Sequence, residues 1–249
     1  MIDQSQLTPE FVAGLMDYTL LKPEATHRDV ASLISDAQRL NCKAICVSPS
    51  MLPIAGREDS DVGIDSLRVA TVAGFPSGKH ASLIKAAEAR FAVQCGADEV
   101  DVVIDVAAAI AEDSNAVLSE LMTVREAIPH PVVLKVILES AVLTEQQLRT
   151  AVRAAVQAGT DYVKTSTGFH PAGGATVEAV RIMADELQSL KCHAPLGMPD
   201  AVMQTQGLVG LKASGGIRDW DTAVAMIGAG ATRLGVSGAQ AILDSAPPQ

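Results

Sequence analysis

The chain has 249 residues, of which 48% are apolar and only 3% aromatic, so its core must consist of Ala, Val, Ile and Leu. This length fits two small domains or one large α/β barrel, and such a core is typical of helix-covered parallel strands. The formal net charge is −10, with 29 acidic against 19 basic residues. An acidic chain with few aromatic side chains is a poor candidate for binding nucleic acid or an anionic membrane.

The predicted location is the cytoplasm. No apolar run reaches the length of a membrane span, and residues 1–10 lack the basic and then apolar pattern of an export signal. The cysteines form no Cys-x-x-Cys pair and match no zinc site, which favours buried thiols in a reducing compartment. They are Cys42, Cys46, Cys95 and Cys192.

Short apolar segments alternate with helical patterns along the chain. Several are nearly continuous in Val, Ile and Leu, as expected for strands covered on both faces. Repeated strand–helix alternation predicts an α/β fold, a single (β/α)8 TIM barrel over residues 1–249, with a doubly wound open sheet as the alternative. The predicted strands are residues 18–21, 44–48, 68–73, 99–105, 132–138, 162–167, 209–214 and 233–237.

The predicted helices have recognisable ends. Thr26 and Asp29 resemble a capping box at the start of one helix. A glycine turn recurs where helices end and strands begin, at Gly96, Gly159 and Gly230. We expect a further helix at residues 9–16 to close the bottom of the barrel. The other predicted helices include residues 29–40, 82–95, 144–158 and 219–228.

Three predicted strands contain a lysine where an apolar residue is expected, at Lys135, Lys164 and Lys212. Each could lie at a strand end with its amine in water. Three such residues favour a functional reason, because lysine is almost never fully buried unless it is paired. Asp101 and Asp105 share a face of the fourth strand, so we expect amines and a carboxylate inside the barrel.

Buried amines suit Schiff-base chemistry. A neutral lysine attacks a carbonyl to form an iminium, which accepts electrons when a neighbouring C–C bond breaks. An ordinary lysine, with a pKa near ~10.4, is protonated at neutral pH. Burial and a second cation together can lower this pKa by up to ~3–5 units, and a carboxylate can then move protons.

Glycine–serine turns follow the last two predicted strands, at residues 214–216 and 235–239. Glycines let backbone N–H groups approach an anion, and loops in these positions are the usual phosphate site of such barrels. The sequence therefore predicts phosphate binding at this end of the barrel.

The chain resembles the deoxyribose-phosphate aldolase family of class I aldolases along nearly its whole length. The most specific match is Lys164-Thr165-Ser166-Thr167-Gly168. Other matching stretches are residues 16–23, 44–47, 70–76, 96–103, 134–139 and 212–216.

The resemblance implies a role for each matched residue. Lys164 would form the Schiff base, Asp101 would shuttle protons, and Lys212 would perturb the pKa of Lys164 and exchange protons. The substrate pocket would include Asp17, Thr19, Cys46, Lys135 and Thr167. The phosphate side of the substrate would be bound by Ser214, Gly215, Gly216, Gly235, Ser237 and Gly238.

The implied reaction is the reversible cleavage of 2-deoxy-D-ribose 5-phosphate to D-glyceraldehyde 3-phosphate and acetaldehyde. It would need no metal and no cofactor, because the iminium is the electrophile. The open alternatives are a Schiff-base enzyme for another sugar phosphate, a metal-dependent lyase and a catalytically silent sugar-phosphate-binding barrel. We also expect a homo-oligomer, in the simplest form a dimer.

Residues 188–207 look like an insertion before the seventh strand. We expect a surface loop at the bottom of the barrel, with a functional lid as the alternative. His170 lies on the catalytic side and could reach the substrate, but a single loop histidine carries little weight.

Overall fold

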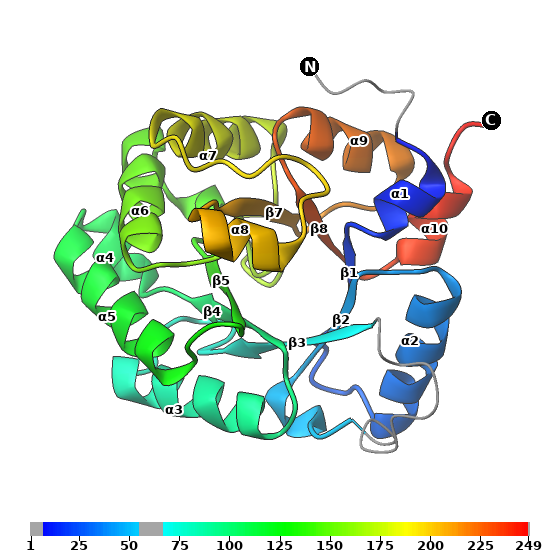
Figure 1. Ribbon diagram of the computed structural model, residues 1–249, viewed down its shortest axis with the longest axis horizontal. Coiled ribbons are helices and arrows are strands. Elements are labelled where there is room, and N and C mark those ends of the chain that lie inside the picture. Colours follow the sequence, from blue (N-terminus) through cyan, green and yellow to red (C-terminus); the bar gives the residue numbers. More distant parts are fainter. Residues whose placement is uncertain (1–6, 55–66, 249) are drawn as a thin grey trace.

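Eight parallel strands close into a barrel in the computed structural model, which describes residues 7–54 and 67–248. Each strand pairs with the next, and β1 pairs with β8 (Figure 1). The predicted (β/α)8 barrel is confirmed, and the open sheet is wrong, because an open sheet would leave β1 and β8 apart. The remaining residues of the predicted 1–249 barrel, at 1–6, 55–66 and 249, lie outside the described residues. The strands are β1 (Met16–Leu20), β2 (Ala44–Val47), β3 (Arg68–Ala73), β4 (Glu99–Val103), β5 (Val133–Ile137), β6 (Tyr162–Lys164), β7 (Gly210–Ser214) and β8 (Arg233–Val236).

Helices form a ring around the barrel (Figure 1). None of those in residues 7–54 and 67–248 combines the length and the apolar character needed to span a bilayer. Short 3-10 helices, η2 (Pro49–Met51) and η3 (Ser140–Val142), follow β2 and β5. The α-helices are α1 (Pro9–Ala13), α2 (His27–Arg39), α3 (Ser82–Gln94), α4 (Val106–Ile110), α5 (Ser114–Ala127), α6 (Glu145–Gln157), α7 (Val177–Ser189), α8 (Asp200–Gln206), α9 (Trp220–Gly228) and α10 (Ala239–Asp244).

Local sequence explains where the helices begin and end. The Thr26 hydroxyl accepts a hydrogen bond from the N–H of Asp29, whose carboxylate accepts from the N–H of Thr26 at 2.8 Å, so the predicted capping box is present. Gly96, Gly159 and Gly230 have φ angles of 95°, 76° and 118° in the turns that lead from helix to strand. These left-handed conformations favour glycine, which explains the recurring turn in the sequence.

Alternation along each strand separates an apolar outside from a charged inside. In β4, Val100 and Val102 belong to the apolar core that the helices cover, whereas Glu99 and Asp101 form ion pairs inside the barrel. Strand register then brings inward residues of successive strands side by side. It places Asp101 beside Lys135 and Lys164 beside Lys212.

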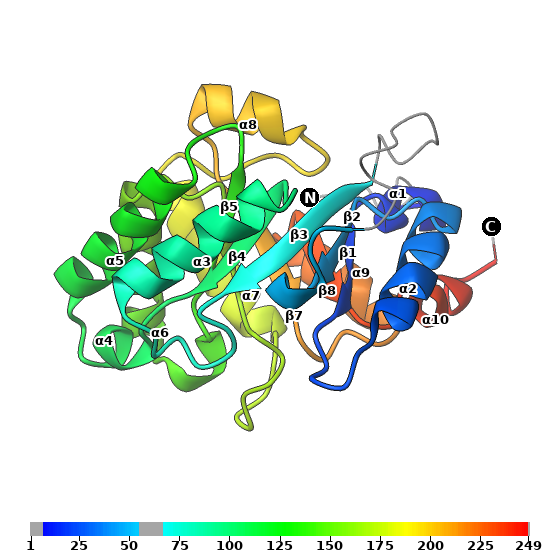
Figure 2. The ribbon, with the colours of Figure 1, turned by 90° about the horizontal axis from the view of Figure 1, so that it is seen from below.

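Helix α8 lies across one end of the barrel, and the loop between β6 and α7 projects from the opposite end (Figure 2). This helix is part of residues 188–207, and Met203 within it is buried. The carboxylate of Asp200 accepts hydrogen bonds from the Tyr162 hydroxyl at 2.6 Å and from Lys43 at 2.9 Å. The segment is therefore packed onto the amino ends of the strands, instead of forming a loose surface loop.

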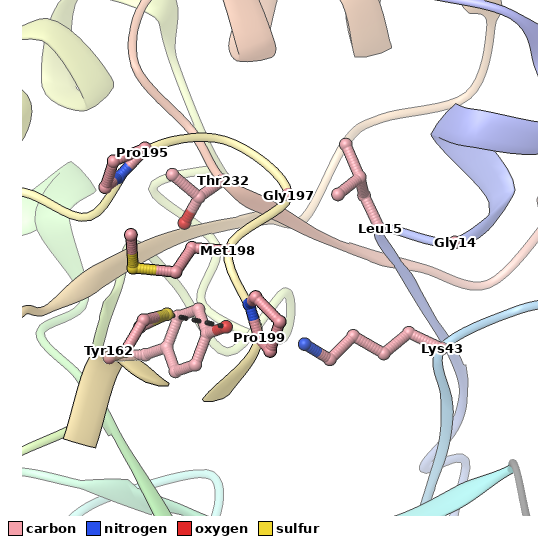
Figure 3. Close-up of a pocket in the computed structure, with 10 residues that line it drawn as sticks. Gly14, Leu15, Lys43, Tyr162, Pro195, Gly197, Met198, Pro199 and Thr232 are labelled. Atoms are coloured by element: carbon pink, nitrogen blue, oxygen red, sulfur yellow. Dashed lines mark hydrogen bonds between the residues drawn. The ribbon is translucent and has the colours of Figure 1, made fainter. Parts of the chain in front are cut away.

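A cavity of about 80 Å³ remains beneath α8. Its wall includes Leu15, Lys43, Tyr162 and Met198, which Figure 3 shows around it. Gly14 and Leu15 come directly after α1, and α1 itself packs against α10. At this end the cavity is thus lined by residues of the α8 segment and by Gly14 and Leu15 after α1, whereas α1, the helix predicted to close it, lies beside α10 (Figure 1).

Candidate active site

Three lysines from successive strands bind one carboxylate inside the barrel. Oδ1 of Asp101 on β4 accepts a hydrogen bond from Nζ of Lys135 at 2.6 Å. Its Oδ2 accepts hydrogen bonds from Nζ of Lys164 and from Nζ of Lys212, at 2.8 Å each. Lys135 and Lys212 are fully buried and Lys164 is 3% exposed, so the interpretation that these amines reach into water is wrong. The predicted cluster of amines around a carboxylate is present.

A second layer of ion pairs lies deeper in the barrel, toward α8. Asp17 binds Lys212 through Oδ2, and its Oδ1 accepts from Nε of Arg233 at 2.7 Å. Glu99 binds Arg233 at 2.5 Å and Lys135 at 2.8 Å. Asp17 was predicted to line the pocket. Both of its oxygens are engaged by buried cations, and it contacts the cluster through Lys212 and, at 3.4 Å, through Lys135.

Electrostatics distinguish Lys164 from Lys135. Burial lowers the pKa of Lys164, and the ammonium of Lys212 lowers it further, while Asp101 offsets part of the change. The pKa of Lys135 lies well above its usual value, because its carboxylate neighbours outweigh the effect of burial. Lys164 is therefore the amine that can become neutral, and Lys135 remains an ammonium.

Asp101 is ionised despite its burial. Burial alone would raise its pKa, but the ammonium groups of Lys135, Lys164 and Lys212 hold that pKa well below the usual value. An ionised carboxylate in contact with the amine of Lys164 can accept a proton from a group that reacts there. Its position fits the predicted proton shuttle.

Two further predicted pocket residues, Thr19 and Cys46, lie on the neighbouring strands β1 and β2. Cys46 on β2 is fully buried, and burial raises the pKa of its thiol, which keeps it protonated beside the lysine cluster. The hydroxyl of Thr19 on β1 donates to the backbone oxygen of Asp17 at 2.9 Å.

The loop after β6 is held by a residue to which the sequence assigns no role. Glu139 is buried, has φ 54°, and accepts the hydroxyl of Thr167 at 2.6 Å and the N–H of Thr167 at 3.2 Å. The predicted pocket residue Thr167 is thus fixed in place through Glu139. In the sequence, the position of Glu139 directly after the predicted apolar strand 132–138 is the feature that could indicate this role.

The glycine turns lie at the carboxyl ends of β7 and β8. Gly215 and Gly216 have φ angles of 87° and 85°. The N–H groups of Gly215, Gly216, Ser237 and Gly238 donate to no acceptor in the part of the chain that the structure describes. These backbone donors, on two neighbouring loops, are suited to an anion such as a phosphate.

Ser214 and Gly235 differ from the other predicted substrate contacts, because both serve internal packing. The Ser214 hydroxyl donates to the carbonyl of Ser166 at 2.6 Å. A Cβ at Gly235 would lie 2.8 Å from Cβ of Ser214 and 3.0 Å from Cε of Lys212, so this glycine leaves room for the lysine.

The expected pairing of Asp101 with Asp105 on one strand face is wrong. Strand β4 ends at Val103, and Asp105 instead caps α4 and forms a surface ion pair with Lys79 at 2.8 Å. Glu99 is the residue that shares the inward face with Asp101.

Comparison with known proteins agrees with the resemblance found in the sequence. A protein-family model described as DeoC/LacD family aldolase matches residues 11–244. A deoxyribose-phosphate aldolase of Corynebacterium jeikeium is 68% identical over 243 residues, which cover 97% of this chain and 98% of that protein. One from Corynebacterium glutamicum is 50% identical over 236 residues, covering 95% and 96%. The tetrameric deoxyribose phosphate aldolase structure from Aeropyrum pernix matches with a TM-score of 0.79 at 31% identity, covering 96% of this chain and 92% of that one.

Proposed function

The chain belongs to the DeoC/LacD family of aldolases, and we propose that Lys164 is the nucleophile with which it forms a Schiff base. The reaction is the reversible cleavage of 2-deoxy-D-ribose 5-phosphate to D-glyceraldehyde 3-phosphate and acetaldehyde, in the breakdown of deoxyribose phosphates. The observation that carries the proposal is the position of Lys212, whose Nζ shares an oxygen of Asp101 with Nζ of Lys164. A second ammonium so close, together with burial, favours the neutral amine that attack requires.

The proposed cleavage begins when Nζ of Lys164 adds to the C1 aldehyde and water leaves, which forms an iminium. Asp101, directly or through a water, takes the proton of the C3 hydroxyl. The C2–C3 bond then breaks, its electron pair moves to the iminium to form an enamine, and D-glyceraldehyde 3-phosphate leaves. Protonation of the enamine at C2, with Lys212 as the candidate donor, and hydrolysis release acetaldehyde and restore the lysine.

The remaining residues position the substrate in this proposal. The donors of Gly215, Gly216, Ser237 and Gly238 hold the phosphate. Cys46, Thr19 and Thr167 shape the pocket. Lys135 fixes Asp101, and Asp17 fixes Lys212, through ion pairs. The proposed site residues are Asp17, Thr19, Cys46, Asp101, Lys135, Lys164, Thr167, Lys212, Ser214, Gly215, Gly216, Gly235, Ser237 and Gly238. The iminium is the electrophile, so the proposed reaction needs no cofactor.

Reductive trapping tests this proposal. Protein is incubated with acetaldehyde and cyanoborohydride, digested and analysed by mass spectrometry. We expect an ethyl group on Nζ of Lys164 and none in a control without acetaldehyde. A modified Lys212 with an unmodified Lys164, or no adduct on either residue, would contradict the assignment.

Two further measurements separate the rival functions. Competition between 2-deoxy-D-ribose 5-phosphate and other sugar phosphates distinguishes this substrate from those of another Schiff-base enzyme. Full activity in excess chelator would remove the metal-dependent lyase, and measurable turnover removes the silent binding barrel. Loss of activity in chelator that returns with added metal ion would instead favour the metal-dependent lyase.

We also propose a cytoplasmic homo-oligomer, in the simplest form a dimer. The free thiols of Cys42, Cys46, Cys95 and Cys192 fit a reducing compartment. Three large apolar side chains of α3 are exposed, Leu83 to 74%, Phe91 to 61% and Ile84 to 56%, as is common at interfaces between subunits. Sedimentation velocity tests this assembly, and a monomer at all concentrations would contradict it. Recovery of the protein from an exported or membrane fraction would contradict the location.

Residues 188–207 belong to the single-domain barrel in this proposal, as an insertion whose helix α8 covers the amino ends of the strands. This position lies at the end of the barrel away from the glycine turns, so a lid over the substrate is not proposed for it.

A further inference from the structure

Arg233 is a fully buried cation for which the proposed reaction has no step. It begins β8, and it binds Asp17 through Nε at 2.7 Å and Glu99 through a terminal nitrogen at 2.5 Å. Its guanidinium carbon lies 5.3 Å from the centre of the Tyr162 ring. The other terminal nitrogen is buried without a hydrogen-bond partner among the described residues, and its separation from Oδ1 of Asp200 is 3.9 Å.

A purely structural role accounts poorly for this residue. Burying a guanidinium is costly, and apolar side chains of similar volume can often replace a whole buried ion-pair network at no loss of stability. The unpartnered nitrogen adds to that cost. The contacts of Arg233 instead reach the two carboxylates that lie directly behind Lys135 and Lys212.

The charge of Arg233 affects the balance of charges inside the barrel, and so the protonation of the lysines. Among residues 7–54 and 67–248, the side chains there, each no more than 4% exposed, carry three carboxylates and four cationic groups. One cation is therefore in surplus, and the charges balance when one lysine loses its proton. The carboxylates are Asp17, Glu99 and Asp101, and the cations are Lys135, Lys164, Lys212 and Arg233.

We propose that Arg233 is a positioning residue for the reaction: it occupies Asp17 and Glu99 so that Lys164 is the surplus cation of the barrel. This inference rests on the proposed role of Lys164 as the nucleophile. Arg233 stays protonated at neutral pH, so its charge is permanent. Its position behind the lysines keeps both carboxylates from acting as further partners for a protonated Lys164.

The groups that face these residues come from several elements. Lys164 faces Asp101 on β4, Lys212 on β7 and Cys46 on β2. Arg233 faces Asp17 on β1, Glu99 on β4, Tyr162 on β6, Asp200 on α8 and Lys135 on β5, with Lys43 next to Asp200. Arg68 approaches the second oxygen of Glu99 at 3.6 Å, but it is 40% exposed, and solvent screens its charge.

The test is the pH dependence of trapping by acetaldehyde and cyanoborohydride, measured as the midpoint at which the Lys164 adduct reaches half its maximal rate. Arg233→Met removes a cation, so the charges inside the barrel then balance with Lys164 protonated. We expect the midpoint to move to alkaline pH by roughly one unit. Glu99→Gln removes a carboxylate and keeps the shape of the side chain, so its midpoint should move to acidic pH. The double variant restores the balance and should return toward the wild-type midpoint.

A matched control is Arg125→Met. Arg125 is partly buried and binds Asp161 at 2.8 Å, outside the barrel interior, so this variant should lose stability while its midpoint stays at the wild-type value. Identical midpoints in wild type, Arg233→Met and Glu99→Gln would overturn the inference, even with reduced rates. If Arg233→Met does not fold, an unchanged midpoint in Glu99→Gln is sufficient to overturn it. Failure of the wild type to form the adduct would instead contradict the proposed function.

Discussion

Lys135 and Lys164 bind opposite oxygens of Asp101, and their pKa values move in opposite directions. Lys135 also contacts Glu99 and Asp17, and these carboxylates stabilise its ammonium form. Among the carboxylates that the structure describes, Lys164 pairs with Asp101 alone, and it shares Oδ2 of Asp101 with Lys212. The pKa values of these two amines therefore differ because further carboxylates surround Lys135, whereas a second ammonium lies beside Lys164.

Substitution of the proposed nucleophile should remove chemistry without removing binding. Lys164→Ala should reduce turnover by about 10⁴-fold or more, because it removes the amine that attacks the substrate carbonyl. The donors in the turns after β7 and β8 remain, so calorimetry with D-glyceraldehyde 3-phosphate should still detect binding. The surface variant Lys79→Ala is a suitable control, since Lys79 is 59% exposed. Near-normal turnover by Lys164→Ala would disprove the mechanism.

Lys212 should influence the reaction through the protonation of Lys164. Lys212→Leu removes the ammonium that lowers the pKa of Lys164, so that pKa rises and the acid limb of the pH–rate profile should move to alkaline pH by about 1–3 units. Lys85→Leu provides a comparison, because Lys85 is equally buried but pairs with Glu120 outside the barrel. Its profile should keep the wild-type midpoint at reduced stability. An unshifted profile for Lys212→Leu would show that proximity of the two amines has no electrostatic consequence.

Asp101→Asn should change the rate and the profile in different ways. Loss of the proton acceptor should lower turnover by about 10²–10⁴-fold. Asp101 raises the pKa of Lys164, so its removal should move the midpoint for trapping to acidic pH. Lys212→Leu and Asp101→Asn are thus expected to shift Lys164 in opposite directions. Parallel shifts in both variants would be inconsistent with the ion pairs of the site.

Much of this site could be predicted from the sequence, since its residues break a simple pattern. Lysines in strands otherwise rich in Val, Ile and Leu stand out, and the alternation of side chains places them inside. The pattern could not rank Lys164 above Lys212, because both are inward residues in adjacent positions of neighbouring strands. Their difference depends on burial and on distances to third residues, and only the resemblance of the motif separated them beforehand.

Other parts of the site depend on closure of the barrel. Glu99 and Arg233 begin β4 and β8, where a charged residue is easily interpreted as a strand end in water. Their ion pair joins strands that are not neighbours in the sheet, so no local pattern reveals it. The expectation that Asp105 shares the strand face of Asp101 is wrong for a local reason. Strand β4 ends two residues before Asp105, and capping of α4 determines the position of that carboxylate.

Packing of the glycine loops should control affinity for the phosphate. A Cβ at Gly174 would lie 2.8 Å from Cα of Gly215 and closer still to its carbonyl oxygen, so Gly174→Ala must displace the turn after β7. We expect kcat/KM for 2-deoxy-D-ribose 5-phosphate to fall by about tenfold, mostly through KM, as donors to a charged group are lost. The rate with unphosphorylated 2-deoxy-D-ribose should change little. Gly228→Ala is the control, because a Cβ there would meet no atom outside its own helix turn within 4 Å. Equal losses with both substrates would argue against a phosphate site here.

Asp200 should stabilise the closure of the amino end in a pH-dependent way. Burial would raise its pKa, but Arg233, Lys43 and the Tyr162 hydroxyl outweigh burial and lower it. A lowered pKa means that the carboxylate contributes its full stability above the pKa of the unfolded chain, near ~3.9, and loses it as pH falls through the folded value. Asp200→Asn should therefore reduce the free energy of unfolding by about 1–3 kcal/mol at neutral pH.

Below about pH 4 this difference between wild type and Asp200→Asn should shrink, because the wild-type carboxyl becomes neutral as well. Denaturant titrations at several pH values measure it. Asp36→Asn removes a surface ion pair with Arg39 and should change the free energy of unfolding by no more than about 1 kcal/mol. A difference for Asp200→Asn that stays constant or grows in acid would show that the charge of Asp200 does not hold α8 on the barrel.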